Sequence, residues 1–120
     1  MSLRLTGEPI DQEIDVVEVH GDLDLATAAT LKRRLRNAID EGWRRVVVDL
    51  TNVTFIDSSG IAALVFARRR LDSSGGAIAI VAPTDQQQHV FELTGLDGVL
   101  GVKGSKPEAV AYLGQHQRSP

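Results

Sequence analysis

The chain has 120 residues, 42% of them hydrophobic and 24% charged, which is the composition of one globular domain large enough to bury a core. It has no cysteine, which excludes disulfides, thiol catalysis and thiolate metal sites, and its formal net charge of −3 favours neither nucleic acid nor an anionic membrane as a partner. No apolar run approaches the roughly 18 residues of a membrane span, and no signal-peptide pattern opens the chain, so we expect a cytoplasmic protein.

The first half of the chain predicts two strands, a helix and a third strand. Residues 3–6 alternate in polarity, and a turn-rich stretch joins them to a strand at residues 14–20, so the first strand is expected at an antiparallel edge. Asp24 can cap a helix over residues 25–40, which Gly42 ends. The β-branched run at 45–50 is typical of a strand covered on both faces. The helix is expected to bury Leu31, Leu35, Ala38 and Ile39 and to expose Lys32, Arg33, Arg34 and Arg36.

The second half continues the alternation of helices and strands. A helix over residues 61–71 is closed by the turn residues 73–76, and a buried strand follows at 77–81. Thr84 and Gln87 have the spacing of a capping box. The predicted elements after it are a helix that buries Val90, Phe91 and Leu93 and stops at Gly95, a strand at 99–102, and a last helix from Pro107 that carries Val110 and Leu113.

This order of elements predicts the α/β class. Right-handed crossovers make the sheet mostly parallel, with an antiparallel N-terminal edge strand and about four helices packed on it. We expect a single domain over residues 1–114, followed by a polar tail at 115–120.

No catalytic constellation can be assembled from the sequence. The three histidines, His20, His89 and His116, lie in unrelated positions and do not form the spaced pair of a metal site. Both usual phosphate-binding loops are absent, and residues 101–106, which superficially resemble one, read as an ordinary loop. We therefore expect no enzymatic activity, no metal and no cofactor.

Four acidic residues stand near predicted strand ends and allow two interpretations. Asp22, Asp24, Asp49 and Asp57 could in principle meet at one rim of a parallel sheet and hold a cation. The alternative is that Asp24 and Asp57 cap helices while the other two solvate the strand ends, and we prefer it.

The most informative segment is the junction at residues 56–62, where a strand layer passes into a helix. An acidic residue and two serines, Asp57, Ser58 and Ser59, stand at this helix start. A helix N-terminus offers free backbone N–H groups and a positive dipole end, so it can carry a phosphate. The serines can equally be ordinary helix-start residues.

Three motifs in order resemble the STAS domain family, and specifically the bacterial anti-sigma-factor antagonists. Residues 46–63 read VVVDLTNVTFIDSSGIAA, residues 21–28 read GDLDLATA, and residues 91–97 read FELTGLD. The similarity spans about residues 3 to 113 of this chain.

The resemblance implies a regulatory protein that catalyses nothing. In such antagonists a serine of the D-S-S-G motif, usually the first, is phosphorylated by the anti-sigma factor, which is itself a serine kinase. That serine corresponds to Ser58 here, with Ser59 as the alternative. The unphosphorylated form binds the anti-sigma factor, the sigma factor is released, and a serine phosphatase restores the antagonist. The expected partner-binding residues are Asp24, Asp57, Ser58, Ser59 and Gly60.

Several alternatives remain open at this point. Gly60 can let a partner approach the helix start or can serve close helix–sheet packing, and Arg68 to Arg70 can be a solvated face or can assist docking. Other functions compatible with the family are a non-phosphorylated scaffold or transporter accessory subunit, and a small-molecule sensor that uses the rim cleft of the sheet.

Overall fold

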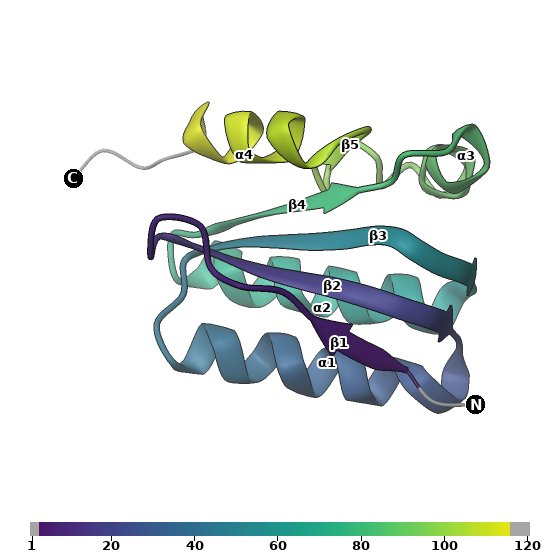
Figure 1. Cartoon of the computed structure of the whole chain (residues 1–120), viewed down its shortest axis with the longest axis horizontal. Helices are drawn as coiled ribbons and strands as arrows, with labels where there is room; N and C mark the ends of the chain where they lie inside the picture. The colour runs from purple at the N-terminus through teal and green to yellow at the C-terminus, as the bar shows by residue number, and fades with distance from the viewer. Residues whose placement is uncertain (1–2, 116–120) are drawn as a thin grey trace.

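The computed structural model describes residues 3–115, which form one sheet and its covering helices (Figure 1). The strands are β1 (Arg4–Thr6), β2 (Ile14–Leu23), β3 (Arg45–Ile56), β4 (Ala77–Val81) and β5 (Val102–Lys103). The helices are α1 (Leu25–Asp40), α2 (Ser58–Ser73), α3 (Asp85–Leu93) and α4 (Lys106–Gln115).

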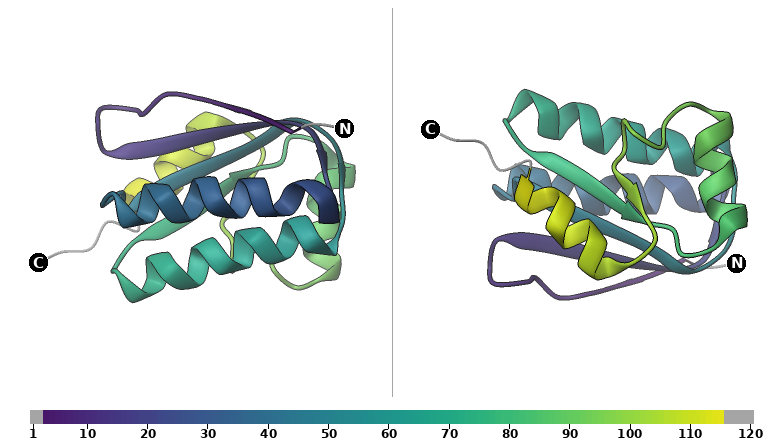
Figure 2. Two further views of the ribbon diagram at one scale, coloured as in Figure 1. Left: turned by 90° about the horizontal axis from the view of Figure 1, so that it is seen from below. Right: turned by 90° about the horizontal axis from the view of Figure 1, so that it is seen from above.

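The strands follow one another in the sheet in the order β1-β2-β3-β4-β5. Strand β1 pairs antiparallel with β2, and every other pairing is parallel. Helices α1 and α2 lie side by side on one face, α4 covers part of the other face, and α3 lies at the end of the sheet (Figures 1 and 2). The predicted fold class is confirmed.

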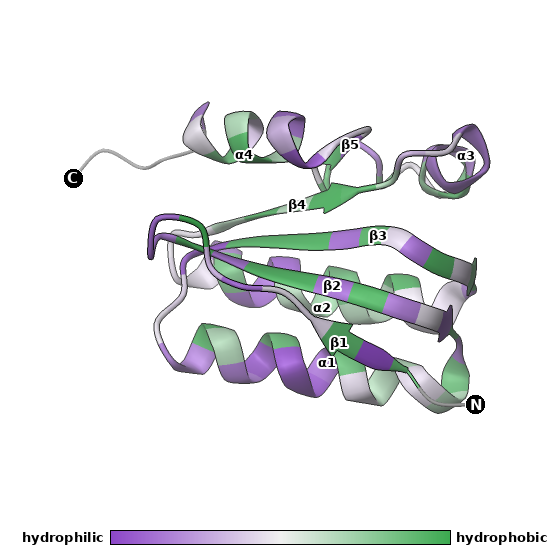
Figure 3. Cartoon of the chain, in the orientation of Figure 1, coloured by the Kyte–Doolittle hydropathy of each residue, from purple (hydrophilic) through white to green (hydrophobic). Residues whose placement is uncertain are grey.

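Two apolar clusters hold these layers together. The larger one joins α1 and α2 to the sheet, and the predicted stripe of α1 is confirmed because all four of its residues are buried. The smaller one joins Ala109 and Leu113 of α4 to the other face. In Figure 3 the hydrophobic colour accordingly runs along most of β2, β3 and β4, as expected for strands covered on both faces.

Arg34 was predicted to be exposed, but in the structure it is half-buried. Its guanidinium donates two hydrogen bonds to the Asp15 carboxylate, at 2.8 and 3.2 Å, and the Asp15 residue is only 4% exposed. A buried carboxylate requires a paired cation, and the planar guanidinium supplies one in bidentate geometry. The prediction was wrong because helical periodicity places Arg34 near the edge of the buried stripe but gives no sign of a buried acid on β2.

Strands β2 and β3 run further than predicted, to Leu23 and Ile56. Strand β4 pairs with β3 only as far as Asp49, which leaves the edge of the later residues of β3 uncovered by a strand. The Gln87 side chain of α3 fills part of this gap, because its amide nitrogen donates to the Leu50 carbonyl oxygen at 2.8 Å. Gln87 thus completes the capping box with Thr84 and also protects a strand edge.

Helix α2 begins at Ser58, three residues before the predicted start at 61. Ser58 and Ser59 therefore lie in its first turn. The expected close of this helix is confirmed, since Ser74 is its C-cap and Gly75 adopts a φ of 79°.

Two predictions for the C-terminal half were wrong. Leu93 is 73% exposed, since it follows the buried Phe91 by two residues and so points to the other side of α3. The strand expected at 99–102 is instead β5 at Val102–Lys103. The residues before it make a turn that buries Leu100 and ends at Gly101 with a φ of 60°.

Within residues 3–115 no helix combines the length and the apolar character needed to cross a membrane. Gln115, the first residue of the predicted tail, is the last residue of α4. Residues 116–120 lie outside the described residues.

Candidate functional site

The candidate site lies where the carboxyl ends of β2 and β3 meet the starts of α1 and α2. The two strands pair along their length, with Leu23 opposite Ile56 at the end of the register. The backbone N–H of Asp57 then donates to the Leu23 carbonyl oxygen at 3.1 Å. This bond holds the two helix starts beside each other.

Asp24 is the N-cap of α1, as predicted. Its carboxylate accepts hydrogen bonds from the backbone N–H groups of Ala26 and Thr27, at 3.0 and 3.1 Å. The Thr27 hydroxyl oxygen accepts in return from the Asp24 backbone N–H, which completes a capping box. The Asp24 side chain thus has a structural role at the rim of the site.

Asp57 is the N-cap of α2, through a single side-chain hydrogen bond. Its carboxylate accepts from the Ser59 backbone N–H at 2.8 Å. Ser58 is exposed, Ser59 is half-buried, and the Ser58 Oγ has no hydrogen-bond partner among residues 3–115. Of the two serines, Ser58 therefore presents its hydroxyl more fully to solvent, at the positive end of a four-turn helix.

Gly60 is buried and packs the helix start tightly onto the sheet. A Cβ at this position would lie 2.5 Å from the Leu23 Cγ and 3.1 Å from the Ile56 Cγ1. Of the two roles considered for Gly60, the geometry shows the close packing between α2 and the ends of β2 and β3.

Sequence reasoning missed two apolar side chains at the site. Leu25, which directly follows the Asp24 cap, is 79% exposed, and Phe55, near the end of β3, is 53% exposed. Phe55 stands opposite Asp22 in the register. The exposure of Leu25 could have been predicted from the sequence, because Leu25 lies in the first turn of the predicted helix but outside its buried stripe. Exposed large apolar residues beside an exposed serine indicate a protein-binding surface.

A cavity of about 300 Å³ opens beside this site, between the end of β3 and α3. Phe55, Ile56 and Val90 give it apolar walls, and the remaining residues that line it are Thr51, Val53, Thr54, Thr84, Gln86 and Gln87. All of these side chains are uncharged, so the cavity offers no charged group for a phosphate or a carboxylate.

The acidic residues and histidines do not assemble a reactive centre in the described structure. Asp22 accepts a hydrogen bond from the Thr54 hydroxyl, and Asp49 lies near Lys106 rather than near Asp57. Among residues 3–115 no three histidine, cysteine or acidic side chains are grouped to hold a metal ion. His20 contacts Thr6 on β1 and His89 contacts Glu92 on α3, while His116 lies outside the described residues.

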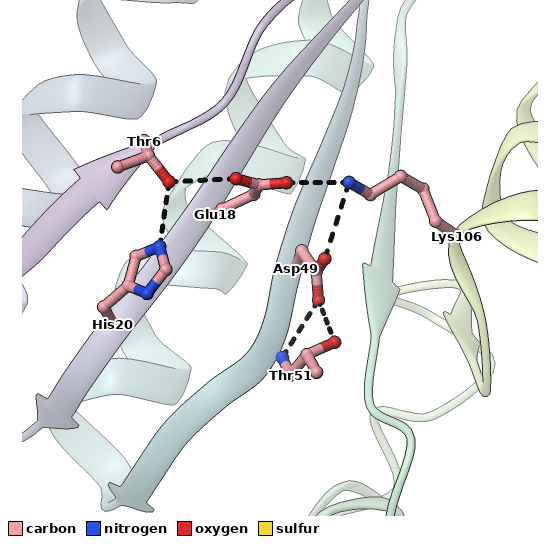
Figure 4. A network of polar contacts seen from close by, with 6 residues as sticks. All are labelled: Thr6, Glu18, His20, Asp49, Thr51 and Lys106. Atoms are coloured by element: carbon pink, nitrogen blue, oxygen red, sulfur yellow. Dashed lines mark hydrogen bonds and ion pairs between the residues drawn. The ribbon is translucent and has the colours of Figure 1, made fainter.

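A second polar cluster lies on the face of the sheet that α4 partly covers (Figure 4). The Lys106 ammonium donates to the Glu18 carboxylate at 2.8 Å and lies 3.7 Å from the Asp49 carboxylate. Thr6 donates to the other oxygen of Glu18 and contacts His20, which ties β1 into the same network. Since Glu18 and Asp49 are direct partners in the register, the cation separates two like charges.

Two residues of this cluster, Glu18 and Lys106, have shifted pKa values. The hydrogen bond from Lys106 and that from Thr6 lower the pKa of Glu18 from its usual 4.5. The hydrogen bond to Glu18 raises the pKa of Lys106 above 10.5. Stabilisation by Glu18 is therefore complete above pH 4.5 and is lost as the pH falls through the lowered pKa. Stabilisation by Lys106 is complete below pH 10.5 and is lost as the pH rises through the raised pKa.

Lys106→Met is expected to lower the free energy of unfolding by about 1 kcal/mol at neutral pH, since the pair is about one-third exposed. The loss should shrink as the pH falls through the pKa of Glu18, because protonation removes both the pair and the repulsion from Asp49. Urea unfolding from pH 3 to pH 8 measures this, with Lys103→Met as the control. A loss of the same size at every pH would contradict the electrostatic role.

Comparison with known proteins agrees with the fold and the motifs. A family model described as STAS domain matches residues 9–109. The Anti-sigma-B factor antagonist of Staphylococcus aureus is 31% identical over 86 residues, which cover 72% of this chain and 80% of that protein.

Solved structures match the fold across most of its length. An anti-sigma factor antagonist from Mycobacterium paratuberculosis has a TM-score of 0.79 and 24% identity, covering 92% of this chain and 93% of that one. The anti-sigma factor antagonist SpoIIAA in its unphosphorylated form has a TM-score of 0.71 and 18% identity, covering 93% of this chain and 98% of that one. The Bacillus protein SpoIIAA in its phosphorylated form has a TM-score of 0.71 and 22% identity, covering 91% and 98%.

Proposed function

The chain belongs to the STAS domain family, and from this premise we propose that it is an anti-sigma factor antagonist switched by phosphorylation of Ser58. In its unphosphorylated form it binds an anti-sigma factor that has serine kinase activity, and so frees the sigma factor for transcription. The kinase then inactivates it, and a serine phosphatase restores it. The observation that carries the proposal is the exposed Ser58 hydroxyl in the first turn of α2, which has no hydrogen-bond partner among residues 3–115.

In the phosphoryl transfer, this chain supplies only the attacking hydroxyl of Ser58. The Ser58 Oγ attacks the terminal phosphorus of ATP, the bond to ADP breaks, and the hydroxyl proton passes to a base of the kinase. The phosphoserine adds roughly −1.5 to −2 charges at pH 7. The positive end of the α2 dipole and its free backbone N–H groups tolerate that charge, so the fold needs no rearrangement.

We therefore propose that phosphorylation acts at the interface with the kinase and leaves the fold of this chain unchanged. The proposed partner-binding residues are Asp24, Asp57, Ser58, Ser59 and Gly60, with Gly60 acting through packing because it is buried. A kinase surface fitted to the free hydroxyl meets added bulk and charge after phosphorylation. Both the phosphorylated and the unphosphorylated SpoIIAA structures share the fold of this chain. A phosphorylated form with a rearranged backbone over residues 55–65 would contradict an interfacial switch.

Incubation with purified anti-sigma kinases and ATP is expected to add one phosphate, which peptide mass spectrometry locates on Ser58. Ser58→Ala should abolish the modification. Ser59→Ala is the matched control and should remain a substrate, because its change lies one residue away and leaves the exposed hydroxyl in place. Phosphate on Ser59, or only elsewhere in the chain, would overturn the assignment.

A further inference from the structure

The two helices on one face of the sheet carry most of the positive charge of an acidic protein. Helices α1 and α2 hold seven of the chain's 13 lysines and arginines but only two of its 16 aspartates and glutamates. The rest of the chain has six basic and 14 acidic residues. The helix layer is therefore basic although the net charge is −3.

Four of these seven cations have no carboxylate partner among residues 3–115. Arg34 pairs with Asp15, Arg68 with Asp72 at 3.0 Å, and Arg70 with Asp40 at 2.8 Å. The four exposed side chains that remain are Lys32, Arg33, Arg36 and Arg69. Their charge is available to a partner.

One of these cations, Arg69, lines an apolar groove that begins at Ser58. The groove has a volume of about 440 Å³ and runs along the outer surface of α2. The residues that line it are Ser58, Ile61, Ala62, Val65, Phe66 and Arg69. Its floor is therefore apolar, with a hydroxyl near one end and a cation near the other.

Helix α1 extends the basic rim along the same groove, since α1 and α2 lie side by side (Figure 2). The Lys32 Nζ lies 4.5 Å from the centre of the Phe66 ring, and Asp40 reaches Arg70 of α2. Arg36 stands one helical turn from each of these α1 residues, so it lies on the side of α1 that faces α2.

We infer that this groove binds an acidic amphipathic helix of the anti-sigma partner, an inference that rests on the proposed function. The apolar face of such a helix would cover Ala62, Val65 and Phe66, and its carboxylates would meet Lys32, Arg36 and Arg69. A nucleic acid or an anionic membrane fits less well. Its extended negative charge would meet only the four unpaired cations of α1 and α2, on a chain whose net charge is −3.

This charge pattern predicts that phosphorylation of Ser58 weakens binding of the partner helix. Arg69 stands 11 residues after Ser58, about 16 Å along the helix axis. Screening at physiological ionic strength, where the Debye length is about 8 Å, weakens the attraction between Arg69 and a phosphate on Ser58. The phosphate repels those carboxylates of the incoming helix that lie near the start of α2, while the carboxylates near Arg69 are affected less.

The test compares the association rate of this chain with an anti-sigma kinase that phosphorylates Ser58. Arg69→Glu is expected to slow association about tenfold at low salt and to weaken the salt dependence of the rate. Lys103→Glu makes the same change in net charge on β5, away from the helix layer, and should leave the rate within about twofold. A rate insensitive to both salt and Arg69→Glu would overturn the inference, while phosphorylation of Ser58 would leave the proposed function standing.

A second measurement examines the groove without the kinase. A synthetic 20-residue helix with glutamates on one face and leucines on the other is titrated into the labelled protein and followed by NMR. Shifts centred on Lys32, Phe66 and Arg69 that Arg69→Glu removes are expected. Tighter binding to a DNA duplex or to vesicles of anionic lipid than to this helix would overturn the choice of partner. Failure of Ser58 phosphorylation with intact peptide binding would refute the proposed function and with it the anti-sigma partner, while the binding of an acidic helix to the groove would stand.

Discussion

Ser58→Asp is expected to weaken binding to the anti-sigma kinase about 100-fold, while Ser58→Ala binds as the wild-type chain does. The aspartate places a negative charge where the free hydroxyl meets the partner, and like charges brought together at an interface cost several kcal/mol. A 100-fold loss corresponds to about 2.7 kcal/mol. Isothermal titration calorimetry or surface plasmon resonance with the purified kinase measures it.

Ser58→Asn separates charge from bulk in this experiment. Asparagine has nearly the shape of aspartate but no charge, so it should lose much less affinity than Ser58→Asp if repulsion dominates. Circular dichroism should be unchanged in all three variants, since Ser58 is exposed and its hydroxyl is unpartnered among residues 3–115. Thermal unfolding should be unchanged as well, apart from a small rise for Ser58→Asp, because an acidic side chain in the first turn of α2 interacts favourably with the helix dipole. Equal affinity of Ser58→Ala and Ser58→Asp would refute the switch.

Gly60→Ala should destabilise the protein by about 2 kcal/mol, although alanine is the better helix former. The added methyl group would stand 2.5 Å from the Leu23 Cγ, and Leu23 is fully buried, so the helix start or the core has to move. Overpacking of this kind costs typically 1 to 3 kcal/mol. Urea unfolding gives the loss, and slower phosphorylation of Ser58 should accompany it because the first turn of α2 shifts.

Gly114→Ala provides the matched control for this substitution. Gly114 also lies in a helix, α4, but nothing stands within 4 Å of the Cβ that it would gain. Because Gly114 is the second-to-last residue of α4, the substitution should stabilise the protein by at most about 0.5 kcal/mol. If both alanine variants were stabilising, Leu23 would have moved aside and the packing role of Gly60 would be refuted.

The sequence predicted those parts of the fold that depend on local chemistry. Asp24, Asp57 and Thr84 were identifiable as helix caps because each short polar side chain precedes an apolar, helical pattern. The motifs around Ser58 indicated the site for the same reason, since a strand, a cap and a helix follow directly in the chain.

The rest depended on contacts between distant residues. Arg34 reads as a surface residue until Asp15 is placed beneath it, and the bond from Gln87 to Leu50 spans 37 residues. Leu93 was wrongly assigned to the core because a nine-residue helix with one strongly buried side chain gives a weak periodic signal. The groove along α2 could not be predicted either, because its rim comes from a second helix whose position only the fold determines.

The side-chain amide of Gln87 has a further consequence, for the behaviour of the protein at high concentration. The end of β3 is rich in β-branched and aromatic residues and extends beyond the strand that pairs with it. An exposed edge of this kind is a template for pairing with a second chain, and such pairing starts aggregation. Because Gln87 occupies the Leu50 carbonyl of this edge, α3 protects the protein against self-association while leaving Phe55 exposed beside Ser58.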